Sequence, residues 1–220
     1  MKSKTLGLIH TSATLVPVFK ELCDILLPGT TVFNIVDDSL IKDVIRKGKL
    51  TRTTARRVVD HVGSAEIAGA DHILVTCSSI GAAVEVADSL TEVPVLRVDQ
   101  PMVDLAINTG TRIGVIATLP TTLEPTSDLV RRRALVAKKK IDITSRLCEG
   151  AFDALMNGDP DKHDDMVAGA LRQLAEEVDV ILLAQASMAR VVEKLGEADK
   201  KVPIISSPSE AIKHLASILN

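Results

Sequence analysis

The 220-residue chain contains no tryptophan and no tyrosine, and it has only three phenylalanines, at positions 19, 33 and 152. Without tyrosine, no phenol can serve as a catalytic acid or as a donor to an anion. The chain also lacks the wide aromatic platforms on which single-stranded nucleic acids stack. Its core must consist of Val, Ile, Leu and Ala, which suits buried parallel strands and the helices that cover them.

A strong net charge is absent as well. The formal charge of −3 gives no electrostatic footprint for nucleic acid. Two stretches are locally basic, "RKGKLTRTTARR" (46–57) and "RRRALVAKKK" (131–140). Their apolar residues recur at helical spacing, which predicts solvated helix faces in preference to a polyanion site.

Long apolar runs and clustered cysteines are also missing. No segment approaches the length of a membrane span, and the first residues contain too short an apolar run for a signal peptide. The three cysteines form neither a disulfide framework nor a zinc pattern. The one dense group of potential metal ligands, "DKHDD" (161–165), follows Pro160, and acidic residues there complement the dipole of a first helical turn. We expect a cytoplasmic protein without a metal and without membrane contacts.

The chain does contain short β-branched runs that alternate with amphipathic helical stretches. This alternation predicts an α/β fold with parallel sheets and right-handed crossovers. The expected strands are 5–9, 31–36, 72–76, 93–98, 112–117, 141–144, 180–184 and 203–206. The expected helices are 15–26, 53–68, 80–89, 102–107, 123–137, 149–156, 163–177 and 188–195.

The alternation also repeats. "LGLIHTS" around Gly7 returns as "IGVIATL" around Gly114, 107 residues later. "ADHILVTCSSIG" returns as "VDVILLAQASMA", and "VPVLRV" returns as "VPIISS", at spacings of 108 and 109 residues. We interpret the repeat as a domain duplication that produces two pseudo-symmetric lobes, each with a four-stranded parallel sheet. The predicted lobes are residues 1–99 and 100–207, with a C-terminal helix, 208–220, that packs on the first lobe.

Ligands of parallel α/β sheets bind beyond the carboxyl ends of the strands and at domain interfaces. We therefore predict an active site in a cleft between the lobes, lined by the segments that follow equivalent strands. The predicted substrate-binding residues are Thr11, Ser12, Ser78, Ser79, Thr118, Thr121, Thr122, Ala186 and Ser187. For the hydroxyl residues, helix capping is an equally weighted interpretation.

Cys77 is the predicted catalytic residue. It follows a strand and precedes a helix, where free N–H groups lower the pKa of a thiol and stabilise anions. The alternative is that Cys77 only packs, as many free cysteines do, and this is what we expect of Cys23 and Cys148. His10, at the end of the first strand, is a candidate general base.

Several other chemistries lack their motifs. Neither G-x-G-x-x-G nor G-x-x-x-x-G-K-[ST] occurs, so dinucleotide and P-loop phosphate binding are unsupported. Ala83 stands where a tyrosine-phosphatase loop needs arginine, and the residues that flank Cys77 lack the glycines of a nucleophile elbow. A small anionic substrate remains, held by hydroxyl and backbone N–H groups against a thiol.

The duplicated lobes, Cys77 after the third strand and "GVIATLPTTLEPT" (114–126) together resemble the aspartate/glutamate racemase superfamily. That group includes hydantoin racemases, arylmalonate decarboxylase and maleate isomerase. The resemblance spans nearly the whole chain and is to a branch with a single active-site cysteine. It implies a cofactor-independent isomerase or racemase that acts on a small carboxylate, with Cys77 as acid, base or nucleophile.

In racemases of this superfamily, two cysteines flank the α-carbon of the substrate, and Cys77 matches the first. The second falls at Gln185, or at Ala186 if the alignment slips by one residue, and neither is an acid or a base. This departure leaves open a single-thiol decarboxylase, a cis–trans isomerase of a small dicarboxylate, and a carboxylate-binding protein without catalysis. Besides the small carboxylate, the expected partner is a second copy of the chain, since dimers are the commonest assemblies.

Overall fold

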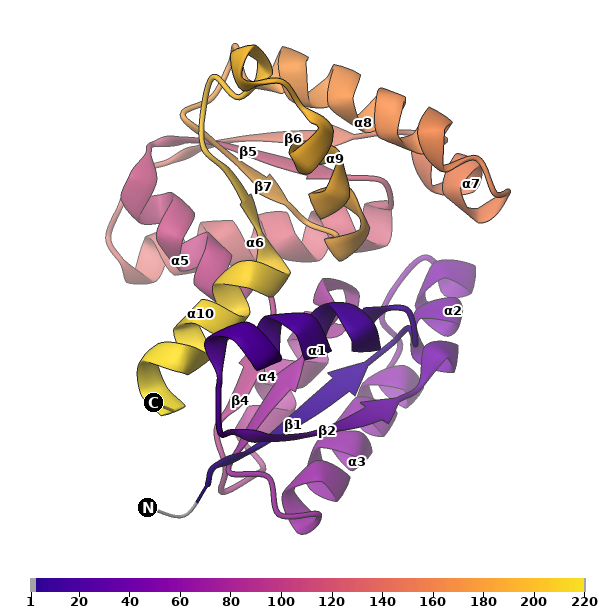
Figure 1. Ribbon diagram of the computed structural model, residues 1–220, viewed down its shortest axis with the longest axis vertical. Coiled ribbons are helices and arrows are strands. Elements are labelled where there is room, and N and C mark those ends of the chain that lie inside the picture. Colours follow the sequence, from indigo (N-terminus) through magenta and orange to yellow (C-terminus); the bar gives the residue numbers. More distant parts are fainter. Residues whose placement is uncertain (1–2, 220) are drawn as a thin grey trace. The chain divides into compact units, whose positions relative to one another are not determined.

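A computed structural model of the protein describes residues 3–219, and the chain divides into two compact units. Unit 1 extends to Gln100 and includes the segment from Pro208 onward, whereas unit 2 is Pro101–Ser207. Each unit contains a four-stranded sheet in which all neighbouring strands are parallel, flanked by helices (Figure 1). The predicted α/β fold with two such sheets is confirmed. Within residues 3–219, no helix has both the length and the apolar character of a membrane span.

Unit 1 begins with a strand and ends with the last helix of the chain. Its elements are β1 (Thr5–His10), α1 (Leu15–Leu26), β2 (Thr31–Val36), α2 (Asp38–Lys47), α3 (Arg52–Ile67), β3 (His72–Val75), a 3-10 turn (Ser78–Ile80), α4 (Gly81–Asp88), β4 (Val95–Arg97) and α10 (Ser207–Leu219). The strand order in its sheet is β2-β1-β3-β4.

Unit 2 repeats this plan. Its elements are α5 (Gln100–Thr109), β5 (Arg112–Ala117), α6 (Pro120–Val136), β6 (Asp142–Leu147), α7 (Ala151–Met156), α8 (Pro160–Leu174), β7 (Val180–Leu183), a 3-10 turn (Ala186–Met188), α9 (Ala189–Lys194), a second 3-10 turn (Glu197–Asp199) and β8 (Ile204–Ser206). The strand order is β6-β5-β7-β8, the same as in unit 1. The two sheets therefore place their first and third strands side by side in the same way.

Each sheet is buried on both faces because successive side chains of a strand point to opposite sides. In unit 1, Leu8 and Leu74 pack with α1 and α10, whereas Ile9 and Val75 pack with α2, α3 and α4. In unit 2 the strand side chains likewise pack against α5 and α6 on one face of the sheet and against α8 and α9 on the other. Aliphatic residues alone fill most of these layers, as the composition predicts.

The helix that follows the fourth strand of each sheet packs in the other unit. α10 follows β8, yet Ala211, Ile212 and Leu215 belong to the core of unit 1, where α10 lies beside α1 (Figure 1). α5 follows β4, yet Met102 and Val103 belong to the core of unit 2. The two units are thus completed by an exchange of one helix each.

The repeat extends to the polar contacts at the amino ends of the strands. Asp71, which precedes β3, accepts a hydrogen bond from the backbone N–H of Thr5 at 2.8 Å. Asp179, which precedes β7, accepts one from the backbone N–H of Arg112, also at 2.8 Å. Each carboxylate ties the start of the first strand to the start of the third, so it helps to set the register of the central strand pair.

The structure corrects several predicted element boundaries. Helix α2 was not expected. At its start, the side chain of Asp37 accepts a hydrogen bond from the N–H of Ser39, and after its end Gly48 adopts a left-handed conformation with φ of 65°. These are an N-cap aspartate and a left-handed glycine after the C-terminus, two ordinary helix signals. Strand β6 extends to Leu147, beyond the expected 141–144, because it pairs with β5 along its full length. Helix α6 starts at Pro120, before the expected 123–137, because proline fits a first helical turn.

Two equivalent glycines allow helices to approach the central strands. A Cβ at Gly114 in β5 would lie 2.8 Å from Leu174 Cδ2, a side chain of α8. A Cβ at Gly7 in β1 would lie 3.4 Å from Cβ of Ala65, a residue of α3, and 3.1 Å from Cζ of Phe33 in the neighbouring strand β2. Both sites are tight, and the contact at Gly114 is the more severe.

We predict that Gly114→Ala lowers the free energy of unfolding by about 1–3 kcal/mol, because the added methyl group overpacks the contact with Leu174. Gly169, in α8, has no atom within 4 Å of a Cβ position. Gly169→Ala is the matched control and should raise stability by about 0.5–1 kcal/mol, since alanine favours a helix. Urea denaturation of both variants is the measurement. Equal stability of Gly114→Ala and the unsubstituted protein would contradict the packing argument.

Candidate active site

Cys77 lies at the carboxyl edge of the sheet of unit 1, where four hydrogen-bond donors converge on its sulfur. Ile9 of β1 pairs with Val75 of β3. Thr11 lies two residues after Ile9 and Cys77 lies two residues after Val75, so both come just beyond the ends of these neighbouring strands. The hydroxyl group of Thr11 donates to Sγ, and so do the hydroxyl and backbone N–H of Ser79 and the backbone N–H of Ile80. Such an arrangement stabilises negative charge on the sulfur.

The pKa of the Cys77 thiol is nevertheless raised, which corrects the expectation of a lowered value. Desolvation by burial is the largest cause, and the hydrogen bonds from Thr11, Ser79 and Ile80 lower the pKa without overcoming it. At neutral pH the resting side chain is therefore the thiol. The four donors act mainly on the thiolate once the proton has left.

The other two cysteines lie in apolar clusters. Cys23 and Cys148 are buried, at 3% and 6% exposure, whereas Cys77 is partly exposed. Burial raises the pKa of both Cys23 and Cys148 to about 11. Their place in the apolar clusters agrees with the structural role expected of them.

The hydroxyl residues near Cys77 differ in what they contact. Ser78 is 4% exposed, and its Oγ has no hydrogen-bond partner within residues 3–219. Ser12 Oγ lies 2.8 Å from Thr14 Oγ1, in the turn that leads into α1. The hydroxyl group of Ser12 is thus engaged in this turn, although the N-cap of α1 is Thr14 and has no side-chain cap. Ser78 presents a donor that the described part of the protein does not use.

His10 is fully buried and both of its ring nitrogens have partners. Nδ1 lies 2.8 Å from Thr76 Oγ1, and Nε2 lies 2.9 Å from Asn34 Oδ1. Burial lowers the pKa of His10, although the bond to Asn34 raises it. A neutral ring that donates from Nε2 and accepts at Nδ1 satisfies both contacts. These contacts join β1, β2 and the segment after β3, and the role of His10 as a general base stays a prediction.

A buried ion pair supports the turn that carries Cys77, and we did not predict it. The Arg97 guanidinium donates to both oxygens of Asp99 at 2.8 Å, and Arg97 also pairs with Glu85 of α4. A Cβ at Gly81, the first residue of α4, would overlap the guanidinium of Arg97. Arg97 ends β4 and Asp99 lies in the turn that leads into α5. Two opposite charges this close together, next to an apolar strand, are the signal that could have revealed the pair.

Gln185 takes the place of Cys77 in unit 2. Ile116 of β5 pairs with Leu183 of β7, and Thr118 and Gln185 each lie two residues after these paired residues. Thr118 is therefore equivalent to Thr11, and Gln185 to Cys77. Oε1 of Gln185 accepts from the backbone N–H of Thr118 at 2.5 Å and from its hydroxyl group at 2.9 Å. The Nε2 group of Gln185 takes no part in these bonds. In each unit a threonine thus donates to the side chain that follows the third strand.

The remaining predicted residues of unit 2 lie in helical turns near this pair. Thr121 and Thr122 belong to the first turn of α6, and Oγ1 of Thr121 has no partner within residues 3–219. Ala186 and Ser187 form the 3-10 turn after Gln185 and are partly buried. The binding roles of these four residues stay predictions. A cleft shared by both units also stays a prediction, since each unit is described by itself.

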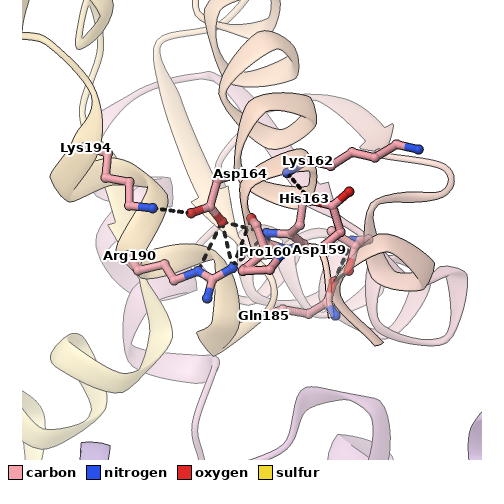
Figure 2. A network of polar contacts seen from close by, with 9 residues as sticks. Asp159, Pro160, Lys162, His163, Asp164, Gln185, Arg190 and Lys194 are labelled. Atoms are coloured by element: carbon pink, nitrogen blue, oxygen red, sulfur yellow. Dashed lines mark hydrogen bonds and ion pairs between the residues drawn. The ribbon is translucent and has the colours of Figure 1, made fainter. Parts of the chain in front are cut away.

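A polar network lies beside Gln185, and sequence reasoning missed it (Figure 2). Asp164 of α8 accepts from His163 Nδ1 at 2.8 Å, from Arg190 Nη2 at 2.8 Å and from Lys194 Nζ at 2.7 Å. Burial raises the pKa of Asp164, but the bonds from Lys194, His163 and Arg190 more than offset it and hold the pKa at about 2. The network ties α9, which follows the turn after Gln185, to α8. Arg190 and Lys194 lie four residues apart on α9, so they share one face of the helix. This spacing of two cations is the sequence signal that could have predicted the network.

The segment 161–165 lies in the first two turns of α8, as expected from Pro160. Its buried carboxylate, Asp164, is surrounded by cationic groups. In residues 3–219, no three His, Cys, Asp or Glu side chains are grouped so that they could hold a metal ion.

Comparison with protein families gives one match that covers most of the chain. The family model described as Asp/Glu/Hydantoin racemase matches residues 6–215. The chain belongs to this racemase family. A comparison with curated proteins finds no match.

Solved structures share the fold of this racemase-family protein at low sequence identity. A glutamate racemase from Bacillus anthracis has a TM-score of 0.70 and 21% identity, over 100% of this chain and 82% of the other. An aspartate racemase from Picrophilus torridus has a TM-score of 0.73 and 13% identity, over 98% and 95%. An allantoin racemase from Klebsiella pneumoniae has a TM-score of 0.69 and 17% identity, over 99% and 88%. These similarities show the fold, whereas the chemistry must be argued from the residues.

We predict that alkylation of Cys77 by iodoacetamide accelerates with pH and has its midpoint above the ordinary thiol pKa, because the pKa is raised. Thr11→Val removes one donor to the thiolate. It should raise the pKa further and slow alkylation at pH 8 several-fold, as the loss of about 1 kcal/mol implies. Peptide mass spectrometry separates Cys77 from Cys23 and Cys148.

Thr118→Val is the matched control, since it makes the same change at the equivalent position of unit 2. It should leave the pH profile of Cys77 unaltered. A Thr11→Val profile identical to that of the unsubstituted protein would show that the Thr11 hydroxyl does not stabilise the thiolate.

Proposed function

We propose that this protein is a cofactor-independent isomerase that acts on a small carboxylate, with the thiol of Cys77 transferring the proton. The observation that carries the proposal is the convergence of four donors on the sulfur of the one partly exposed cysteine. A cysteine that only packs in a core needs no such set of donors. The family membership supports an enzyme of the racemase type.

The protonation state of Cys77 indicates the direction of its first step. The raised pKa keeps the proton on Sγ in the resting protein. When negative charge develops on the carbon beside a carboxylate, the S–H proton is transferred to that carbon and the electron pair stays on sulfur. The thiolate then accepts the hydrogen bonds from Thr11, Ser79 and Ile80, which are already oriented toward it. Donors prearranged in this way stabilise the charge that forms during the reaction.

Unused donors near the thiol support a carboxylate as the ligand. Ser78 Oγ is buried and unpartnered within the described residues, although it lies next to Cys77 in the chain. In unit 2, the Nε2 group of Gln185 can donate to an oxygen atom, because Oε1 already accepts from Thr118. We assign both groups to the binding of carboxylate oxygens.

The identity of Gln185 favours a second candidate within the same chemistry. A two-base racemase needs an acid–base group on each face of the carbon, and a neutral amide cannot supply one at neutral pH. With the thiol alone, the protein can protonate an enediolate after decarboxylation. It can also add its S–H group across the double bond of a small unsaturated dicarboxylate, so that sulfur bonds to one carbon and the proton to the other. Rotation about the resulting single bond and elimination by the reverse step then return the thiol and the isomerised product. Both reactions need Cys77 and no second acid–base group.

We predict that the protein incorporates solvent deuterium into at least one compound of a panel of malonates, hydantoins, maleate and amino acids in D₂O, followed by NMR. Cys77→Ser should lower that rate about 10²–10⁴-fold, because it removes the acid–base group. Cys23→Ala, at a cysteine of α1 buried in the core of unit 1, should stay within about twofold of the parent rate.

Two outcomes would contradict the proposal. Full activity of Cys77→Ser would exclude the thiol from the reaction. Carboxylate binding without any turnover across the panel would indicate a binding protein that is not an enzyme.

We further predict that Gln185→Cys increases deuterium incorporation into the slowly exchanging enantiomer of a chiral substrate about tenfold or more. The new thiol would accept a hydrogen bond from the hydroxyl group of Thr118, as Cys77 accepts one from Thr11. It would also supply the missing acid–base group. Gln185→Ser is the control, since it shortens the side chain without a comparable acid. Chiral chromatography of the products is the readout. Equal exchange in both variants would show that position 185 is not the counterpart of the second thiol.

A further inference from the structure

β2 lies at an edge of the sheet of unit 1 (Figure 1), and within residues 3–219 it pairs with no strand other than β1. Its sequence, TVFNIV, contains no charged residue and no proline. Thr31, Asn34 and Val36 are exposed, Val36 at 43%. An uncharged edge strand of this length offers its free backbone groups to another chain.

The other edge strands carry features that discourage such pairing. β4 and β8 have only three residues each. β6 has six residues, as β2 does, but Asp142 and Arg146 place a charge near each of its ends. Short edge strands and charged edge residues both protect sheets from association with other chains. Among the edges that the structure describes, β2 is therefore the unprotected one.

The register shows which backbone groups of β2 face the open edge. The N–H of Thr31 donates to the carbonyl group of Lys4 at 2.8 Å, and the N–H of Asp37 donates to that of His10 at 2.9 Å. Along a strand, residues that bond to one neighbour alternate with residues whose backbone groups face the other side. Three residues therefore direct their N–H and C=O groups away from β1, and they are Val32, Asn34 and Val36.

We propose that the open edge of β2 pairs with β2 of a second copy of this chain, antiparallel and about a two-fold axis at Asn34. In this register Asn34 lies opposite Asn34 of the second copy, and Val32 lies opposite Val36 of the second copy. All three outward residues of each copy then exchange both backbone hydrogen bonds with the residue opposite, as alternate pairs of antiparallel strands do. The same surface serves both copies, as a two-fold dimer requires.

The charges at the two ends of β2 suit a second copy. Lys4 lies beside the amino end of β2, and its side chain is 51% exposed, whereas Asp38 follows the carboxyl end. Antiparallel pairing places the amino end of each β2 against the carboxyl end of the other. Lys4 of each copy then lies about two strand spacings, roughly 10 Å, from the segment that carries Asp38 of the second copy. This complementarity favours a second copy over an unrelated extended peptide.

Sedimentation equilibrium over a range of protein concentrations tests the proposal. We expect a reversible monomer–dimer equilibrium for the unsubstituted protein. Val36→Pro removes an outward N–H and leaves the pairing with β1 intact, because an edge strand tolerates proline where its N–H faces outward. It should weaken dimerisation about tenfold or more, since each copy loses one backbone hydrogen bond across the two strands.

The matched control is Leu147→Pro, which makes the same change at the equivalent outward residue of β6. It should alter the dimerisation constant less than twofold, and circular dichroism verifies that both variants are folded. A monomer at every concentration would overturn the proposal and leave the edge to an extended segment of another protein. Equal dimerisation by Val36→Pro and the unsubstituted protein would overturn the assignment to β2.

Cysteine cross-linking tests the register, and it does not require proline in the strand. Opposed residues that exchange both hydrogen bonds have Cα atoms about 5.5 Å apart, within the range of a disulfide. Asn34→Cys should therefore form a disulfide-linked dimer under mild oxidation, detected by non-reducing gel electrophoresis. Val36→Cys is the control, because position 36 lies about 14 Å from its own copy and should not cross-link. Equal cross-linking of both variants, or cross-linking of neither, would overturn the proposed register.

Discussion

The parallel pairing of the first and third strands is the constraint on which the candidate site depends in each unit. Pairing of Ile9 with Val75 brings the segments after β1 and β3 to one edge, and pairing of Ile116 with Leu183 does the same in unit 2. At the opposite edge, Asp71 and Asp179 tie the starts of the same strands together. A slip of one residue would turn the inward side chains outward, so the register and the site are specified together.

In this shared arrangement of strands, the two units differ in the group that accepts the hydrogen bond from the threonine. Thr11 donates to a sulfur atom, and Thr118 donates to an amide oxygen. The backbone around the two acceptors is nearly the same, with φ of −136° at Cys77 and −132° at Gln185. The duplication therefore preserved a position and a donor while the chemistry of the acceptor changed in one copy. The result is one acid–base group where a symmetric protein has two.

The sequence predicted the features that depend on regular patterns, and it missed those that depend on contacts between distant polar groups. The strands and the repeat were visible because buried parallel strands need continuous β-branched runs. Equivalence of Cys77 and Gln185 followed from spacing alone. The raised pKa of Cys77 could not be predicted, because burial and the hydrogen bonds to the sulfur compete and only coordinates show which is larger. The hydrogen bond of His10 could not be predicted for the same reason: Asn34, its partner, lies 24 residues away.

The exchange of α5 and α10 has a consequence for how the protein is made. Unit 2 requires only residues that precede Pro208, whereas the core around Leu6, Leu8 and Phe19 also requires Ala211, Ile212 and Leu215. During synthesis on the ribosome, the half translated first is therefore the half completed last. Its apolar surface waits for α10, so the amino-terminal unit can complete its core only after all of unit 2 has been synthesised.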